Sequence, residues 1–171
     1  QGGLHLVSAG GQVGTLSEPG GLYYQNKPQN DAWSTAKKFL SEVNSFDLTI
    51  DSSNTLHLLY VEKTNNVHGA VYHMTKPANG EWTYPGPTGR SCINIRVVAG
   101  PQNELHALCD KYIGEDGYVY CLHRLPGGSW RSPVKVSELY TYRFGAIDLI
   151  LDKDGTAHFF YTEEDQLLRH R

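Results

Sequence analysis

The chain is poor in several residues and patterns that would mark its class or its chemistry. Only 3 cysteines occur among 171 residues, and no two of them are separated by just two residues, as they would be in a typical zinc site. Lysine and arginine total 15 against 18 aspartates and glutamates, so the basic surface of a nucleic-acid-binding protein is lacking and no such partner is expected. Uncharged apolar runs are only a few residues long, which predicts no membrane span.

Turn-forming and aromatic residues, by contrast, are abundant. The 18 glycines and 11 tyrosines are typical of a β protein with many tight turns. The composition of residues 34–42 favours a helix, but this segment stands where the other copies of the repeat described next have a strand. We therefore predict a strand there and an all-β chain.

A pair of short apolar segments separated by a polar turn recurs along the chain. Residues 46–60 and 147–161 carry the same order of Asp, apolar run, Asp, turn, His and Tyr at identical spacing. A looser copy covers residues 93–109, with a turn that we interpret as one residue longer, and residues 3–7 begin inside another. The period is set by His5, His57, His106 and His158, which stand 52, 49 and 52 residues apart, and by Trp33, Trp82 and Trp130, which stand 49 and 48 apart.

Each repeat accommodates four short strands, which is the pattern of a β-propeller blade. One small twisted sheet cannot bury both of its faces alone, so such sheets stack around a common axis. We predict a propeller of four-stranded antiparallel blades, with about 3.5 to 4 blades in this chain, as a single domain over residues 1–171. The predicted repeats are 1–43, 44–90, 91–138 and 139–171.

The predicted strands do not make a whole number of four-stranded blades, and three arrangements are open. The chain is part of a larger propeller, or an arc that a second copy or another chain completes, or a four-bladed ring with two shortened blades. We favour the first two, because an open arc would expose an apolar face. A second copy or another chain that completes the ring is therefore an expected partner.

The repeat resembles that of a known family. Residues 152–161 read Asp-x-x-Gly-x-x-His-x-x-Tyr, and residues 51–60 read the same except that Asn54 stands where Gly is usual. Together with the turn that precedes each tryptophan, this pattern resembles the repeats of sialidase-like (BNR-type) propellers and of the propeller lectins related to them. The resemblance implies a propeller fold with either glycan binding or descent from a glycosidase.

The same resemblance raises the question of catalysis. A sialidase would gather three arginines, a Tyr-Glu nucleophile pair and an acidic proton donor from several blades. Arg90, Arg96 and Arg143 lie near the starts of repeats, with Tyr140 and Tyr142 close by. However, Arg96 falls within a predicted strand whereas Arg143 precedes one, and other nucleophile motifs are missing. We expect a non-catalytic protein that needs no cofactor.

The four recurring histidines raise the question of a metal site. Ligands of one zinc ion must lie within roughly 4 Å of one another, whereas equivalent positions in neighbouring sheets are about 10 Å apart. We therefore expect no metal, and we expect each ring to hydrogen-bond a backbone group of the neighbouring turn. For the tryptophans we expect packing between blades with the indole N–H bonded, and sugar stacking is the alternative.

Three polar residues are predicted to open the innermost strand of successive repeats, namely Asp47, Asn94 and Asp148. This placement would line a central channel near one of its mouths. One role for them is hydrogen bonding to the backbone of the next blade, which would fix the stagger between blades. The alternative is a channel that holds water or a hard cation.

The cysteines leave two states open. Cys109 and Cys121 fall on neighbouring predicted strands and could approach one another, and Cys92 begins the first strand of the same repeat. We expect three buried thiols, with a disulfide between two of them as the alternative. The compartment is not fixed by the sequence, and a secreted protein is favoured.

Ligand contacts are expected from the segments that join successive repeats and from the turn between the second and third strands of each repeat. These segments are rich in Tyr, Arg, His and Glu, which supply stacking surface, donors and acceptors for a polyhydroxylated ligand. The candidate ligand-binding residues are Tyr84, Arg90, Tyr140, Tyr142, Arg143, His68, Tyr112 and Glu163. An ordinary solvated rim is the alternative.

The sequence therefore predicts a non-catalytic, lectin-like propeller that binds a glycan at repeated shallow sites. Weak equivalent sites gain avidity when they are repeated, which suits such a fold. The alternatives are a protein-interaction scaffold and a fragment of a sialidase-like glycoside hydrolase.

Overall fold

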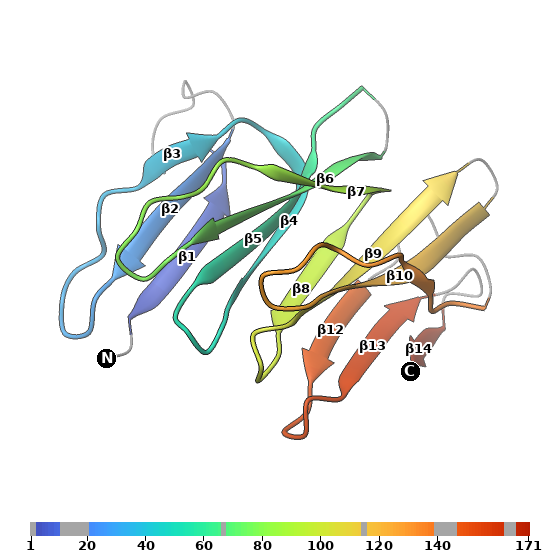
Figure 1. The fold of residues 1–171 in the computed structure, drawn as a ribbon. Helices are drawn as coiled ribbons and strands as arrows, with labels where there is room; N and C mark the ends of the chain where they lie inside the picture. The colour runs from blue at the N-terminus through green and yellow to red at the C-terminus, as the bar shows by residue number, and fades with distance from the viewer. Residues whose placement is uncertain (1–2, 11–20, 66–67, 114–115, 139–146, 163–166) are drawn as a thin grey trace. The chain divides into compact units, whose positions relative to one another are not determined.

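A computed structural model describes residues 3–10, 21–65, 68–113, 116–138, 147–162 and 167–171. In these residues the chain forms fourteen strands and no helix, which confirms the all-β expectation. The strands make four separate antiparallel sheets of three or four strands each (Figure 1). The chain divides into two compact units, Gln1–Val43 and Asn44–Arg171, and each is described by itself.

The first unit holds one three-stranded meander, the first sheet. Its strands are β1 (Leu4–Ala9), β2 (Leu22–Lys27) and β3 (Lys37–Leu40), in that order. The third strand lies within residues 34–42, so sheet pairing overrides the local preference for a helix, as predicted. Its buried apolar residues are Val7, Leu22 and Tyr23.

The second unit holds three sheets, in each of which strands that follow one another in sequence are neighbours. The second sheet consists of β4 (Val43–Ile50), β5 (Leu56–Glu62), β6 (Gly69–Lys76) and β7 (Gly86–Cys92). The third sheet consists of β8 (Ile95–Ala99), β9 (Leu105–Ile113), β10 (Asp116–Arg124) and β11 (Val134–Lys135). The fourth sheet consists of β12 (Ile147–Leu151), β13 (Ala157–Thr162) and β14 (Leu168–His170).

The turn between the first and second strands has one geometry in all three sheets of this unit. Its first residue donates an N–H to the carbonyl four residues later, from Asp51 to Thr55, Gly100 to Glu104 and Asp152 to Thr156. Its fourth residue has a positive φ: 60° at Asn54, 63° at Asn103 and 82° at Gly155. Asparagine tolerates this left-handed conformation better than most residues, which explains how it replaces glycine. The turn in the third sheet is therefore no longer than the others, and the prediction of an extra residue was wrong.

Side chains of β4 satisfy the free edge of β8 in the next sheet. Three side-chain oxygens of β4 accept backbone N–H groups of β8. Ser45 Oγ accepts from Ile95 at 3.2 Å, Asp47 Oδ2 from Val97 at 2.8 Å, and Thr49 Oγ1 from Ala99 at 3.1 Å. Because β8 is the edge strand of its sheet, these N–H groups have no partner strand to bond. The alternating polar residues of β4 therefore fix the stagger between the second and third sheets.

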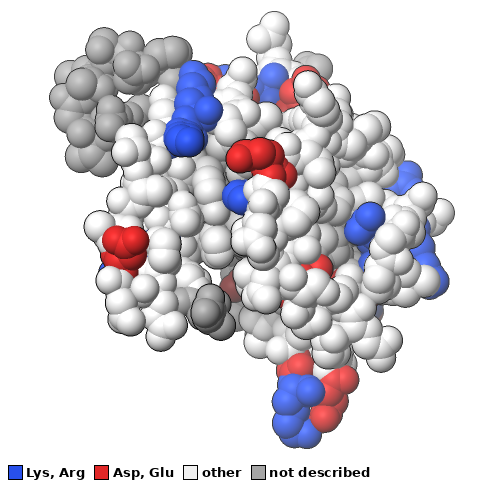
Figure 2. All heavy atoms as spheres, turned by 60° about the vertical axis from the view of Figure 1, so that its left-hand side comes forward, with Lys and Arg blue, Asp and Glu red and all other residues white. Residues whose placement is uncertain are grey.

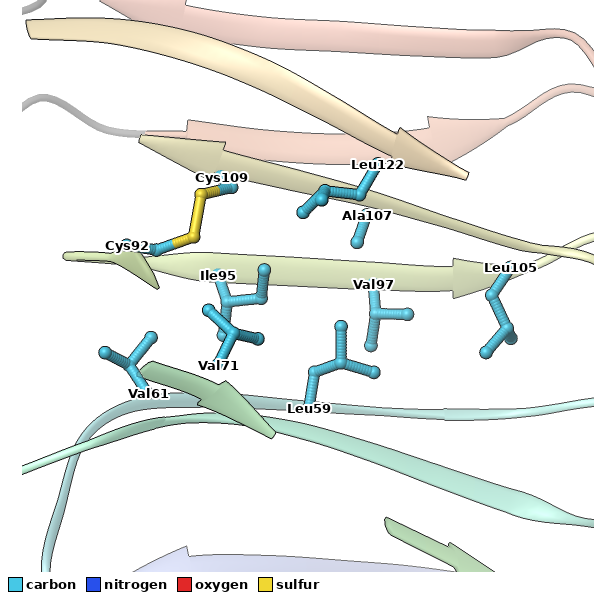
Figure 3. Close-up of a cluster of buried hydrophobic side chains, with 10 residues drawn as sticks. All are labelled: Leu59, Val61, Val71, Cys92, Ile95, Val97, Leu105, Ala107, Cys109 and Leu122. Atoms are coloured by element: carbon cyan, nitrogen blue, oxygen red, sulfur yellow. A yellow bond between two sulfur atoms is a disulfide. The ribbon is translucent and has the colours of Figure 1, made fainter. Parts of the chain in front are cut away.

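Two apolar clusters lie between successive sheets of this unit. The larger one joins the second and third sheets through Leu59, Val61, Val71, Cys92, Ile95, Val97, Leu105, Ala107, Cys109 and Leu122 (Figure 3). The other joins the third and fourth sheets through Leu108, Val119, Val136, Ile147, Leu149 and Tyr161. The third sheet thus buries apolar residues on both faces, which explains why its strand β9 shows little alternation.

The larger cluster contains a disulfide between Cys92 at the end of β7 and Cys109 in β9, with Cα atoms 5.8 Å apart (Figure 3). The expectation of three thiols was therefore wrong. Cys121 is a free, half-buried cysteine. It pairs in register with Leu108, whereas Cys109 pairs with Tyr120, so Cys109 and Cys121 lie on opposite faces of the sheet and cannot bond.

Charged side chains are dispersed over the visible surface. On the face shown in Figure 2, acidic and basic residues form small scattered groups and neither sign makes a continuous patch. No helix capable of crossing a membrane occurs in the described part of the chain.

Candidate functional site

A pocket of about 270 Å³ lies between the outer strands of the second and third sheets. One wall is formed by β6 and β7, and the other by the end of β10 and the turn that follows it. The lining residues are His73, Gly86, Pro87, Thr88, Arg124, Gly128, Ser129 and Trp130. We call this the Arg124–Trp130 pocket. Two glycines leave its walls without side chains, so a ligand can approach the backbone closely.

Arg124 and Trp130 reach the pocket from either end of one tight turn. Arg124 ends β10 and forms an antiparallel bridge with Trp130, and Gly127 between them has a φ of 64°. Trp130 packs against the larger apolar cluster and meets the His73 ring edge-on, with ring centroids 5.7 Å apart. Packing of this tryptophan was expected. Its Nε1 is nevertheless buried without a hydrogen-bond partner in the described residues, contrary to expectation.

The Arg124 guanidinium has no countercharge among the described residues. It forms no ion pair or hydrogen bond within the described residues, although it is half-buried. Burial lowers the pKa of Arg124 because a partly desolvated charge is disfavoured. An unpaired cation in a pocket attracts an anionic group, since the cost of desolvating it is then offset.

His73 is held by a chain of hydrogen bonds that begins in the turn after β4. Asp51 Oδ2 lies 3.1 Å from His57 Nε2, and His57 Nδ1 lies 3.1 Å from His73 Nε2. If the carboxylate accepts from His57 Nε2–H, His57 Nδ1 accepts from His73 Nε2–H, and His73 Nδ1 is left as an acceptor. We call this the Asp51–His57–His73 relay. In this arrangement the relay fixes the tautomer of each neutral ring.

The pKa values of the two histidines agree with this assignment. Burial lowers the pKa of His73 to about 3, helped by the nearby charges of His57 and Arg124. Burial also lowers the pKa of His57, although the Asp51 carboxylate acts in the opposite direction. His73 therefore presents a neutral ring beside the cationic Arg124.

The relay explains the Asp and His of the sequence repeat. In the second sheet Asp51 Oδ1 accepts the N–H groups of Ser53 and Thr55, so one carboxylate both closes the turn and orients a histidine. The fourth sheet repeats the arrangement, with Asp152 to His158 at 3.2 Å and His158 to His170 at 3.0 Å. In the third sheet His106 packs against His123, and in the first sheet His5 bonds Tyr24 Oη at 2.8 Å.

The expected partner of these histidines was therefore wrong. In the described residues, His57 and His158 each bond a turn carboxylate and a histidine of the third strand instead of the turn backbone, and His5 bonds the Tyr24 hydroxyl. Within the described residues, no three His, Cys, Asp or Glu side chains come close enough together to hold a metal ion.

Of the candidate ligand-binding residues from the sequence, Tyr84, Arg90 and His68 do not line the pocket. Tyr84 is 97% exposed, and no side-chain hydrogen bond or ring contact joins it to Arg90 or His68 in the described part of the chain. Arg90 lies in β7 with its Nε buried and unbonded there, and His68 immediately precedes β6. Tyr112 lies in β9, where only its backbone is described. The remaining candidates lie outside the described residues: Tyr140, Tyr142, Arg143 and Glu163.

The three predicted channel residues have different surroundings. Asp47 bonds the next sheet, as described above, and Asp148 is exposed and accepts the N–H of Leu149 at 2.8 Å. Asn94 precedes β8, and its amide donates to the buried Asp110 at 2.8 Å. Because the turns have equal length, Arg96 holds the register position of Asp47 and Asp148 in the third sheet.

Charge interactions also connect these equivalent positions. Burial raises the pKa of Asp47, the charge of Arg96 lowers it, and the charge of Asp148 raises it further. Asp47 therefore interacts electrostatically with both equivalent residues. Two carboxylates and a guanidinium therefore alternate along the three strands β4, β8 and β12.

Sequence reasoning missed His73, Arg124 and Trp130 as a group because they lie near the turns between third and fourth strands. Ligand contacts were expected from the connections at the opposite ends of the strands. A usable signal was present: the tight turn Leu125-Pro126-Gly127-Gly128-Ser129 places a basic residue and a tryptophan at its two ends. Their proximity to His73 depends on sheet packing and could not be read from the turn.

No family model and no curated protein matches the sequence.

Proposed function

We propose that the protein is a non-catalytic, lectin-like β-propeller and that the Arg124–Trp130 pocket binds one sugar residue. Three features support stacked blades. The antiparallel sheets repeat along the chain, three of them share the geometry of the first turn, and side chains of β4 bond the next sheet. The resemblance of the sequence repeat to sialidase-like propellers and propeller lectins supports the same proposal.

The observation that carries the binding proposal is the combination of groups in the pocket. An aromatic ring, a neutral histidine, an arginine and a serine surround a space of about 270 Å³. This is slightly below the range of about 300–1,000 Å³ that drug-sized ligands fill, so it suits a single ring more than an extended chain. Sugars need an apolar surface for the ring face and a few placed donors and acceptors for the hydroxyls.

The scaffold suits such a site. The pocket residues lie on paired strands or on a four-residue turn closed by the bond from Gly128 N to Leu125 O, at 3.0 Å. The disulfide ties the second sheet to the third beside the same apolar cluster. Both walls are therefore held in place before the ligand arrives, which reduces the entropy cost of binding.

A glycan array tests this proposal, followed by calorimetry with the best free sugar. Trp130→Phe keeps an aromatic ring on the apolar cluster but removes the indole, and it should weaken binding about tenfold. Trp33→Phe is the matched control, because Trp33 lies in the first unit and is not a pocket residue. Binding lost equally in both variants, or no sugar bound by the wild type, would contradict a sugar site in this pocket.

We also propose a partner sheet for the exposed face of the fourth sheet, contributed by a second copy of the chain. Asp148 stands where Asp47 bonds the next sheet, and Ile150 beside it is 50% exposed. Both features match a face that receives another edge strand. Light scattering tests this: a dimer supports the proposal, and a monomer at all concentrations opposes it, leaving another chain as the alternative partner.

The disulfide favours a secreted protein, since disulfides persist mainly in oxidising compartments. We propose this location together with the lectin function, because glycans are abundant outside the cell.

A further inference from the structure

We infer that the Arg124–Trp130 pocket is specific for acidic sugars, in which a carboxylate or sulfate group pairs with the Arg124 guanidinium. This inference rests on the proposed function and adds the chemical class of the ligand. Its probes are simple uronic acids and sulfated monosaccharides, compared with their neutral parent sugars.

The Arg124 charge is isolated among the described residues of the pocket. The guanidinium lines the pocket, is half-buried, and meets no carboxylate within the described residues. The chain as a whole carries a net charge of -3, so attraction of an anion to this place is local. A carboxylate or sulfate can bond a guanidinium through two parallel N–H groups, which favours arginine over lysine at such sites.

His73 forms the other polar wall of the pocket. His73 cannot supply a second positive charge at neutral pH, because its Nε2 is engaged by the relay and burial favours its neutral form. In this tautomer His73 Nδ1 is a hydrogen-bond acceptor, and no described residue donates a hydrogen bond to it. One wall thus offers a cation and the other offers an acceptor, which complements a ligand with an anionic group beside hydroxyls.

The remaining surface of the pocket is mostly uncharged and comes from Trp130, Thr88 and the two glycines, among other residues. Trp130 lines the pocket and meets His73 edge-on, and its buried Nε1–H has no hydrogen-bond partner in the described residues. Thr88 already donates its hydroxyl to Val71 O at 3.0 Å, so it contributes mainly its methyl group. A Cβ added at Gly86 would meet only His73 O, at 3.8 Å, and one added at Gly128 would meet Leu125 at the ordinary contact distance of 3.4 Å, so both glycines leave room for at least a methyl group. An inorganic ion would leave most of this surface uncovered.

Calorimetric titration with glucuronate, N-acetylglucosamine 6-sulfate, glucose and N-acetylglucosamine tests the inference. The two acidic sugars should bind at least tenfold more tightly than their neutral parents. Raising the sodium chloride concentration from 0.05 to 0.5 M should weaken only the acidic ligands, because salt screens the ion pair. Inorganic sulfate serves as a separate arm and should bind more weakly than the sulfated sugar.

Arg124→Gln should remove the preference for acidic sugars and leave the affinity for neutral sugars within about threefold. Arg131→Gln is the matched control: it makes the same change in net charge at an exposed arginine outside the pocket, and it should keep the preference. Arg124→Lys, which retains the charge, should keep part of it. If Arg124→Gln does not fold, the salt dependence of the wild type decides the question without a variant.

The outcomes separate the inference from the proposed function. Equal affinity for acidic and neutral sugars, independent of salt, would overturn the inference while leaving a sugar-binding protein. A preference for acidic sugars that survives Arg124→Gln would also overturn it. Binding of inorganic sulfate but of no sugar would overturn both, as would the absence of all binding.

Discussion

Asp47 in β4 accepts the backbone N–H of Val97 in β8 at 2.8 Å, so a side chain of one sheet closes the free edge of the next. The same carboxylate accepts the N–H of Leu48 at 2.9 Å. Burial raises the pKa of Asp47, which shows that the carboxylate is held there against a desolvation cost. The bond to Val97 therefore belongs to the architecture of the stack.

Replacing this acceptor should destabilise the protein. Asp47→Ala leaves the Val97 N–H without a partner, and we expect the free energy of unfolding to fall by about 2 kcal/mol. Asp148→Ala is the matched control, since Asp148 holds the same register position but is exposed, and it should cost less than about 0.5 kcal/mol. Urea denaturation measures both, and equal losses would show that the bond between the sheets contributes nothing.

The disulfide should stabilise the second unit strongly. Cys92 and Cys109 are 17 residues apart, and closing a loop of about that length contributes roughly 3 kcal/mol. The double variant Cys92→Ala, Cys109→Ala should lose about that amount, whereas Cys121→Ala, which removes a free half-buried thiol, should lose less. Denaturation with and without reductant provides the second measurement.

Thiol counting checks the pairing itself. Without reductant the unfolded chain should show a single reactive thiol. In the folded protein this thiol should react slowly, because burial raises the pKa of Cys121 to about 11 and the thiolate is scarce. Three thiols in the protein purified without reductant would contradict the disulfide.

The burial of His73 should make stability depend on acid pH. The folded-state pKa of His73 is about 3, below the ordinary value of 6.5, so the unfolded chain binds this proton first. His73 therefore costs stability as the pH falls below about 6.5, and the loss continues to about pH 3. One such proton gives a slope of about 1.4 kcal/mol per pH unit.

The comparison with His73→Gln isolates this contribution. Asp47 and Asp110 have pKa values raised by burial, so their effect on stability has the opposite sign in acid and only a difference between variants is diagnostic. His73→Gln should reduce the slope between pH 6 and 4 by about 1.4 kcal/mol per pH unit. NMR titration of the histidine ring protons gives a direct check, and a His73 resonance that titrates near pH 6.5 would refute the relay.

Two asparagines at equivalent turn positions should respond differently to glycine. Both have a positive φ, but only Asn103 bonds the neighbouring turn, accepting from Ser52 N at 2.9 Å and donating to Ser53 Oγ at 2.8 Å. Asn103→Gly should therefore lower the free energy of unfolding by about 1 kcal/mol, whereas Asn54→Gly should change it by a few tenths. Thermal denaturation measures both variants, and equal effects would show that the turns act independently.

The sequence period predicted the strands because each repeat obeys local rules. Asp51 and Asp152 close their turns with backbone bonds, and the histidine six residues later orients itself on the same carboxylate. Such short-range chemistry leaves a pattern that can be counted. The third copy was aligned less well, because Gly100 replaces the aspartate and removes the marker that fixed the register in the others.

The pocket could not be predicted in the same way, because its residues meet across two sheets. Arg124 and His73 are far apart in sequence, and their approach depends on the packing of β6 and β7 against the turn after β10. The disulfide was missed for a related reason. Neighbouring strands suggested Cys109 with Cys121, but register places these on opposite faces, and the true partner comes from the previous sheet.

The most direct test of the pocket is the indole N–H signal of Trp130 in a ¹⁵N–¹H NMR spectrum during titration with glucuronate. The chain has 3 tryptophans, and Trp130→Phe identifies the signal by its loss. We predict that the Trp130 signal shifts with saturation, that glucose shifts it only at much higher concentration, and that the Trp33 signal does not move. A Trp130 signal that stays in place while glucuronate binds would contradict the account.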